Sequence, residues 1–177
     1  MIVLDAINEF YNRNNFGDDG GVSKKWVWFK FGFISIPLPN LESRSQNIYL
    51  HDINHLVSGY EANWRGESSI AGWEIASGGW GKAYFPWLLT LWAMGIGVIF
   101  YPKSTFQAYK KGLLMYNALT GQLSKQSMFS VSVDELKIKL QRSPIEINKS
   151  NYTFWAFLGV FTWFFPIMIG LLIYFSF

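Results

Sequence analysis

The sequence contains no cysteine among its 177 residues. Disulfide bonds, thiolate metal sites and cysteine nucleophiles are therefore excluded, and a metal site would have to use histidine, aspartate or glutamate. Charged residues are also scarce, at 15% of the chain with a net charge of +3. They do not gather into one basic face, so we expect no nucleic-acid partner. Histidine is scarcer still, because the chain has only His51 and His55.

Aromatic residues are abundant, with nine Trp, nine Tyr and sixteen Phe, an excess that is typical of contact with a membrane interface. The uncharged segment Thr153–Phe175 is long enough to span a bilayer, with Trp155 and Tyr174 near its two ends. We predict that it is a C-terminal transmembrane anchor. A second apolar segment, 83–101, is marginal in length and contains Pro86. For it we favour a buried or half-inserted helix over a membrane span.

Apolar spacing elsewhere predicts a mainly α fold, a small helical domain with a C-terminal transmembrane helix. We expect an N-terminal amphipathic and aromatic segment (1–45), a helical metal-motif domain that includes the apolar helix (46–150) and the anchor (151–177). Within these, helical spacing or capping signals predict helices over 2–11, 46–58, 67–77 and 105–123, and one opening at 132–135. Residues 26–38 fit either a hairpin strand or a segment resting on the membrane interface.

The distribution of charge predicts which side of the membrane carries the motif. Residues 102–150 contain eight basic and three acidic residues. Basic segments next to membrane helices stay on the cytoplasmic side, or on its organellar equivalent. If 83–101 does not span, the histidines share that side. We therefore expect a membrane protein whose motif domain lies on the cytoplasmic or matrix-equivalent face.

The histidine spacing indicates a metal site. Residues four apart project from the same face of a helix, so His51 and His55 can grip one ion. Glu67 returns from the next helix and can complete the site. Asp52 lies about 100° round the helix, where it can ligate at the edge, orient a histidine or act as a base. Glu74, two turns after Glu67, is a reserve ligand.

The same spacing has a plainer interpretation. Two histidines four apart are often surface residues, or core residues hydrogen-bonded to a backbone carbonyl. A hydrolytic zinc site of the H-E-x-x-H type is a weak alternative, because Asp52 stands where that motif has glutamate and would reach a bound water poorly.

The run His51-Asp52-Ile53-Asn54-His55, followed after eleven residues by Glu67, resembles the H-D-x-x-H-x(11)-E signature of the coenzyme Q biosynthesis protein four family. The following Leu56–Tyr60 is similar to the apolar-Ser/Thr-Gly-Tyr continuation of that family, and Gly66 matches its Gly-Glu pair. The segment Met128–Leu140 resembles its closing helix. The resemblance covers roughly residues 47–143.

The resemblance implies a helical protein of ubiquinone biosynthesis that works on the membrane beside other pathway proteins. It implies a divalent metal, zinc first and iron as the alternative, held by His51, Asp52, His55 and Glu67. The reaction linked to the family removes the ring carboxyl group, with hydroxylation at that carbon, from a polyprenylated aromatic precursor. In such an enzyme Asp52 or Glu67 would handle a proton as the catalytic residue.

The chain departs from the family in its short aromatic N-terminal part and in the predicted C-terminal anchor, which leave the quinone or lipid substrate open. A second function is also compatible with the sequence. The chain could be a non-catalytic scaffold or accessory subunit of a membrane complex, in which the metal only ties two helices together.

Overall fold

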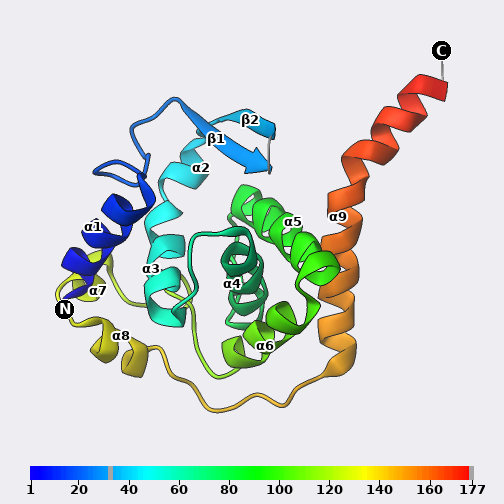
Figure 1. The fold of residues 1–177 in the computed structure, drawn as a ribbon. Helices are drawn as coiled ribbons and strands as arrows, with labels where there is room; N and C mark the ends of the chain where they lie inside the picture. The colour runs from blue at the N-terminus through cyan, green and yellow to red at the C-terminus, as the bar shows by residue number, and fades with distance from the viewer. Residues whose placement is uncertain (32–33, 176–177) are drawn as a thin grey trace.

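The structure is a computed structural model that describes residues 1–31 and 34–175. Within these ranges, the side chains of 27–31, 34–36, 38, 43–44, 165–173 and 175 lie outside the description. The chain is mainly α-helical, as the sequence predicted, and Figure 1 shows its helices arranged around a central one.

The N-terminal segment forms a helix and a hairpin. Helix α1 (Val3–Asn14) turns one apolar face inward and buries the five residues that the periodicity predicted: Val3, Ala6, Ile7, Phe10 and Tyr11. Strands β1 (Trp26–Phe31) and β2 (Ile34–Pro39) pair in antiparallel register, so the first of the two interpretations of 26–38 is confirmed.

Three helices of the motif region follow the hairpin. A single turn, α2 (Glu42–Ser45), leads into α3 (Ile48–Ser58), and α4 (Trp64–Ala76) comes after a short connection. Helix α3 ends at Gly59, whose φ of 75° is a left-handed conformation that glycine adopts without strain. Both α3 and α4 were predicted, although α4 begins three residues earlier than its periodicity indicated.

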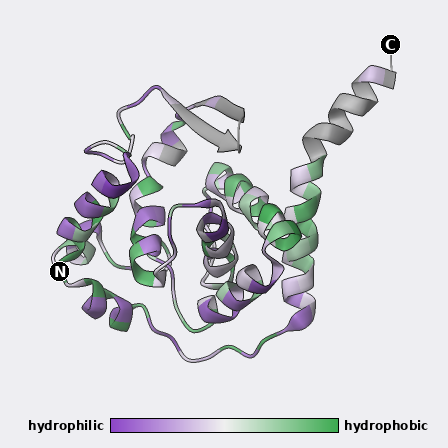
Figure 2. Ribbon diagram, viewed as in Figure 1, coloured by the Kyte–Doolittle hydropathy of each residue, from purple (hydrophilic) through white to green (hydrophobic). Residues whose placement is uncertain are grey.

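Helix α4 lies at the centre of the molecule in Figure 1, packed against α5 (Tyr84–Phe100) and α6 (Pro102–Gly112). The long helix α9 (Lys149–Phe175) packs along α5. Apolar residues dominate α5 and the part of α9 beside it in Figure 2. The two backbones approach so closely that a Cβ added at Gly95 would lie 2.3 Å from the carbonyl oxygen of Gly159.

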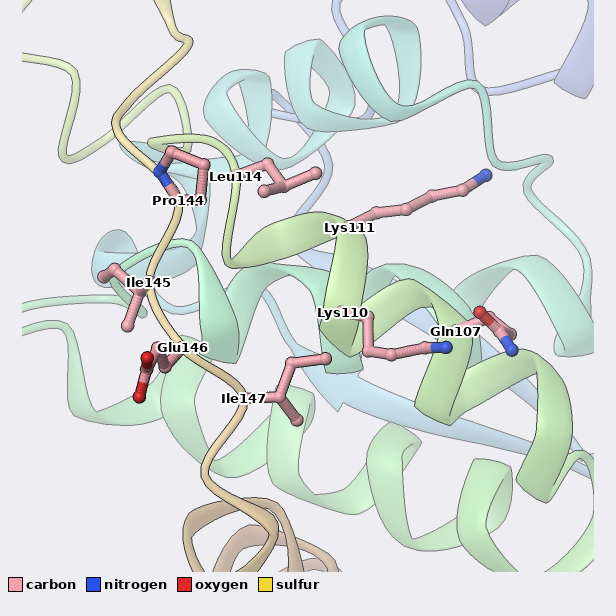
Figure 3. Close-up of a pocket in the computed structure, with 8 residues that line it drawn as sticks. All are labelled: Gln107, Lys110, Lys111, Leu114, Pro144, Ile145, Glu146 and Ile147. Carbon is pink, nitrogen blue, oxygen red and sulfur yellow. The ribbon is translucent and has the colours of Figure 1, made fainter.

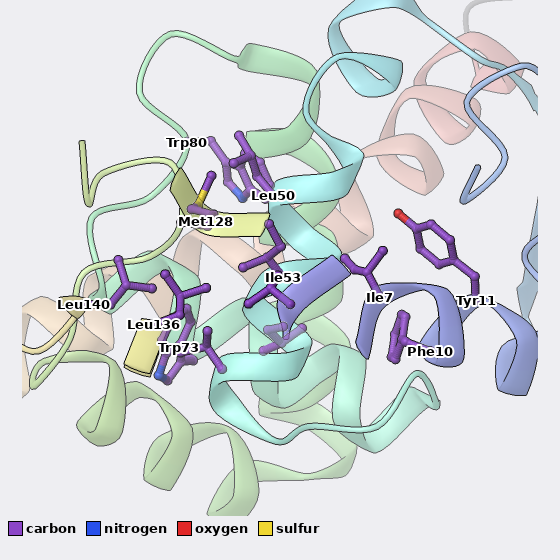
Figure 4. Packing of buried hydrophobic residues seen from close by; sticks show 14 of the residues in the cluster. Ile7, Phe10, Tyr11, Leu50, Ile53, Trp73, Trp80, Met128, Leu136 and Leu140 are labelled. Carbon is purple, nitrogen blue, oxygen red and sulfur yellow. The ribbon is translucent and has the colours of Figure 1, made fainter. Parts of the chain in front are cut away.

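Two short helices close the fold on the other side. Helix α7 (Lys125–Phe129) was not predicted. Helix α8 (Val133–Lys139) has the expected N-cap, Ser132, whose hydroxyl accepts from the Glu135 amide at 3.1 Å. Their apolar residues join the main core (Figure 4), whose labelled members are Ile7, Phe10, Tyr11, Leu50, Ile53, Trp73, Trp80, Met128, Leu136 and Leu140.

The prediction of an amphipathic helix over 105–123 is wrong for the second half of that range. Helix α6 stops at Gly112, where a Cβ would lie 2.3 Å from the carbonyl oxygen of Trp73 on α4. After this close approach the chain turns, and buried Asn117 donates from its side chain to the Gly79 carbonyl at 2.8 Å. Tertiary hydrogen bonds therefore replace the helical ones that periodicity favoured.

The predicted transmembrane segment, Thr153–Phe175, is helical and falls within α9. Within the described part of the chain, no helix is long and apolar enough to cross a membrane. Side chains 165–173, in the second half of the predicted span, lie outside the description. The anchor is therefore not found among the described residues, and it stays a prediction. Helix α5, at 17 residues, is short for a span, which agrees with the buried or half-inserted helix favoured for 83–101.

Candidate metal centre

The connection between α3 and α4 places the three main site residues together. His51 and His55 lie one turn apart on α3. The Asn63 side chain caps α4 by accepting from the Gly66 amide at 2.9 Å, which begins the helix so that Glu67 falls in its first turn. A Cβ at Gly66 would lie 1.8 Å from the Glu61 carbonyl oxygen, so only glycine fits there. The Gly-Glu pair thus brings Glu67 to the histidines.

The donor atoms of these residues converge. The Nε2 atoms of His51 and His55 are 3.1 Å apart. Glu67 places one carboxylate oxygen 3.4 Å from the Nε2 of His51 and the other 3.4 Å from that of His55. Two ligands bound at about 2.0–2.1 Å to a tetrahedral ion lie about 3.3 Å apart. The three separations therefore match the edges of a divalent-metal site.

The Nδ1 atoms of both rings face hydrogen-bond acceptors. The Nδ1 of His55 lies 2.8 Å from the Tyr60 carbonyl oxygen, and that of His51 lies 2.9 Å from a carboxylate oxygen of Glu74. Each Nδ1 must therefore carry the proton, which leaves both Nε2 lone pairs facing each other and Glu67. Such a cluster of acceptors requires a cation, either a proton or a metal ion.

Electrostatics in the metal-free protein agree with this requirement. Burial works to lower the pKa of His51, but Glu74 and Glu67 outweigh it and raise that pKa well above its usual value. Burial works to raise the pKa of Glu67, but the two histidines lower it far below its usual range. Without a metal, the site thus holds a protonated His51 beside an ionised Glu67.

Asp52 lies on a different side of α3. The residue is 3% exposed, and its carboxylate accepts from the Tyr11 hydroxyl at 3.0 Å. Burial raises its pKa to about 6, although the neighbouring histidines and the Tyr11 hydrogen bond oppose the rise. Asp52 lies outside the group of three whose ligand atoms all come within 4.8 Å of one another. Its roles as ligand and catalytic residue stay predictions.

Glu74 does not serve as a reserve ligand beside Glu67. Residues seven apart on a helix are separated by about 10 Å along its axis, which is too far for one ion. The His51 ring lies between them instead, with Nε2 toward Glu67 and Nδ1 toward Glu74. The sequence correctly placed Glu74 on the side of α4 that faces His51. In the structure, however, Glu74 contacts the Nδ1 of His51, whereas Glu67 contacts its Nε2.

The group is accessible from one side. The side chain of His55 is 1% exposed and stacks on Phe10, whereas those of His51 and Glu67 are 22% and 32% exposed. A metal ion held by these three residues would keep a position for water or substrate, and the exposed part of Glu67 marks the side from which solvent would reach it. A pocket of about 400 Å³ lies elsewhere, between α6 and Pro144–Ile147, and contains none of these three residues (Figure 3).

The residues present fit a divalent ion. Two imidazole nitrogens with one carboxylate form a ligand set used for catalytic zinc, and the same atoms suit iron. The group His51, His55 and Glu67 could therefore hold a metal ion. The donor set alone does not choose between the two metals, since both accept nitrogen and oxygen ligands at similar distances.

Sequence reasoning missed the residues that support the site. Tyr11 comes from α1, about forty positions before Asp52, and Trp80 comes from the glycine-rich turn after α4. Asn54 lies inside the motif but at a position that the signature leaves free. Only its place between His51 and His55, on the buried side of α3, could have signalled a role.

Comparison with protein-family models, with curated proteins and with solved structures found no match for this chain. The resemblance described from the motif therefore stays an expectation, and the site's own geometry carries the case for a metal.

Proposed function

We propose that this chain is a metal-binding protein that uses His51, His55 and Glu67 to hold a divalent ion, zinc in the first place and iron as the alternative. The observation that carries this proposal is the convergence of two Nε2 lone pairs and a carboxylate at 3.1–3.4 Å, with both Nδ1 atoms committed to acceptors. No neutral arrangement of the three groups satisfies these contacts.

We further propose that the metal serves ring decarboxylation, with hydroxylation at the same carbon, on a polyprenylated aromatic quinone precursor. This part rests on the resemblance of the motif. A bound divalent ion would supply Lewis acidity toward a carboxylate or toward oxygen or water. Glu67, the most exposed of the three ligands, stands where it can meet an incoming molecule. Asp52, with a pKa of about 6, can bind or release a proton near neutral pH.

Membrane association belongs to the same proposal. Helix α9 exposes a row of Phe154, Phe157, Phe161 and Phe164. Exposed aromatic rings at helical spacing suit insertion among lipid headgroups and acyl chains. Such a surface would bring the site to a lipid-dissolved substrate and to other membrane proteins of the quinone pathway. We propose that the motif domain lies on the cytoplasmic or matrix-equivalent face and that α9 is its anchor.

The alternative function is a scaffold. The ligands come from both α3 and α4, so an ion would also tie these helices together across the connection at Gly59–Asn63. In that case the metal would stabilise a subunit of a membrane complex without taking part in chemistry.

One experiment separates the two functions. We would compare the quinones of a strain carrying the double variant His51→Ala, His55→Ala with those of the wild type and of Glu61→Ala, which alters an exposed carboxylate in the same connection. Accumulation of a carboxylated precursor in the double variant alone supports the enzyme. Metal in the wild-type protein with an unchanged quinone profile in the double variant supports the scaffold instead. If the wild-type protein binds no divalent metal, the proposal fails.

A further inference from the structure

Glu74 is a carboxylate with no exposure to solvent, placed in the core between α3, α4 and α5. Burial of a charged group without partners is strongly unfavourable, so each of its oxygens must be satisfied from within the protein. The structure provides hydrogen-bond donors to both carboxylate oxygens.

Four side chains approach the two oxygens. The first oxygen, Oε1, meets the Nδ1 of His51 at 2.9 Å and the side-chain nitrogen of Asn54 at 2.8 Å. The second, Oε2, accepts from the indole of Trp80 at 3.3 Å and, more weakly, from the hydroxyl of Thr90 at 3.5 Å. The carboxylate is thus surrounded on both sides by groups that can donate.

The direction of these bonds is fixed by neighbours outside the metal site. The backbone amide of Ala118 donates to the side-chain oxygen of Asn54 at 2.9 Å, so the nitrogen of Asn54 must face Glu74 as a donor. The indole of Trp80 can only donate. Glu74 therefore acts as an acceptor throughout, and the Nδ1 of His51 must hold the proton.

We propose that Glu74 is a positioning residue, which fixes His51 as the tautomer with a proton on Nδ1 and so aims the bare Nε2 at the metal. This inference rests on the proposed metal site and adds a residue that the motif does not contain. A carboxylate behind a ligating histidine fixes the ring and makes it a stronger donor. His55 has only the neutral carbonyl of Tyr60 in this place, so His51 is the stronger ligand of the pair.

Glutamine cannot replace this carboxylate. It offers one oxygen and one amide nitrogen, whereas three of the four neighbours of Glu74 present only donors to it and Thr90, the weakest, is alone in having a lone pair to offer. If its oxygen faces His51, its nitrogen opposes the indole of Trp80. If its nitrogen faces His51, Nδ1 must become an acceptor, and the proton moves to Nε2, where it blocks the metal.

The test compares Glu74→Gln with Thr90→Val, which removes the weak donor on the far side of the same carboxylate. We would measure Zn²⁺ affinity in competition with a chelator, together with the nitrogen-15 NMR signals of the histidine side chains. Loss of such a carboxylate typically weakens metal binding 10–100-fold. We expect that loss and a changed His51 Nδ1 signal in Glu74→Gln, while Thr90→Val keeps the wild-type affinity and signal.

A folded Glu74→Gln variant with unchanged affinity and an unchanged His51 signal would overturn the inference. If that variant does not fold, the wild-type protein decides, because its His51 must show a protected Nδ1–H both with and without metal. An Nδ1–H of His51 that exchanges freely with solvent in the metal-free protein, or an unprotonated Nδ1 in the Zn²⁺-bound protein, would overturn the inference. The Nδ1 signal can be measured in metal-free protein. A wild type that binds no Zn²⁺ would therefore contradict the proposed function, while the hydrogen bond between Glu74 and His51 would still be tested by this signal.

Discussion

His51 and His55 share a spacing but not an environment. His55 is enclosed by Phe10 and held by a backbone carbonyl, the arrangement of an ordinary core histidine. His51 is partly exposed and lies between two carboxylates, Glu67 on one nitrogen and Glu74 on the other. In the metal-free site a proton therefore resides on His51. The plainer interpretation of the histidine pair describes His55, whereas the metal interpretation stays a prediction.

The stored proton makes metal binding depend on pH. His51 has a raised pKa and is protonated well above pH 6.5, so a metal must displace its proton. Affinity should rise with pH until that pKa is passed, approaching tenfold per unit for one proton. Calorimetric titration with Zn²⁺ in buffers of different ionisation enthalpy would measure the released proton. An affinity that stays flat between about pH 6 and pH 8 would contradict this account.

Asp52 should destabilise the metal-free protein at neutral pH. Its folded pKa of about 6 exceeds the unfolded value of 3.8, so the folded state binds the extra proton and stability falls as pH rises between these values. Above pH 6 the cost is about 3 kcal/mol at most. Asp52→Asn keeps an acceptor for Tyr11 and should raise the free energy of unfolding more at pH 8 than at pH 4.5.

Urea unfolding at both pH values would measure this effect, with Asp18→Asn in the exposed loop after α1 as the matched control. The control should change the free energy of unfolding little and equally at both pH values. A gain for Asp52→Asn that is equal at the two pH values would show that Asp52 does not titrate in this window.

At the scale of elements, sequence patterns predicted a helix correctly where the helix packs a single apolar face against the core. All five buried residues of α1 followed from helical spacing, and Ser132 followed from its capping box. The patterns failed where a tertiary contact overrode periodicity. Gly112 ends α6 because it abuts α4, and this contact joins residues about forty positions apart. No local signal in the sequence contains it.

The packing of α9 on α5 depends on glycine. A Cβ at Gly95 would clash with the backbone of Gly159, so Gly95→Ala should separate the helices and cost about 1–3 kcal/mol, the usual range for overpacking. Trp87 of α5 and Trp155 of α9 stack with ring centroids 5.4 Å apart and would lose their coupled near-ultraviolet circular dichroism. Leu88→Ala, at an exposed position of α5, is the control. An unchanged Trp signal in Gly95→Ala would refute this packing.

At the scale of the whole molecule, the three residues of the candidate metal site could be predicted because they lie on one helix and on the first turn of the next. The buried network around Glu74 could not, because Trp80, Thr90 and Ala118 reach it from separate parts of the chain. The mainly α class followed from composition and periodicity. The prediction that the anchor segment is helical was also correct, whereas a membrane span is not found among the described residues.

The exposed aromatic row on α9 predicts binding to a lipid surface. Burying a phenylalanine contributes about 1.5–3 kcal/mol, so replacing Phe157 and Phe161 with serine should weaken vesicle binding roughly tenfold or more. Flotation with vesicles of phosphatidylcholine and phosphatidylglycerol would measure it. Ile138→Ser, at a comparably exposed position on α8, should bind as the wild type does. Equal binding by all three proteins would argue against this surface.

The central claim is that His51, His55 and Glu67 hold one divalent ion, and the metal content of the purified protein tests it most directly. Elemental analysis of the wild type and of His55→Ala, which removes the most buried ligand, is sufficient. The account predicts about one zinc or iron ion per chain in the wild type and loss of that ion in the variant. A metal-free wild type, or a His55→Ala variant that keeps the full complement, would contradict it.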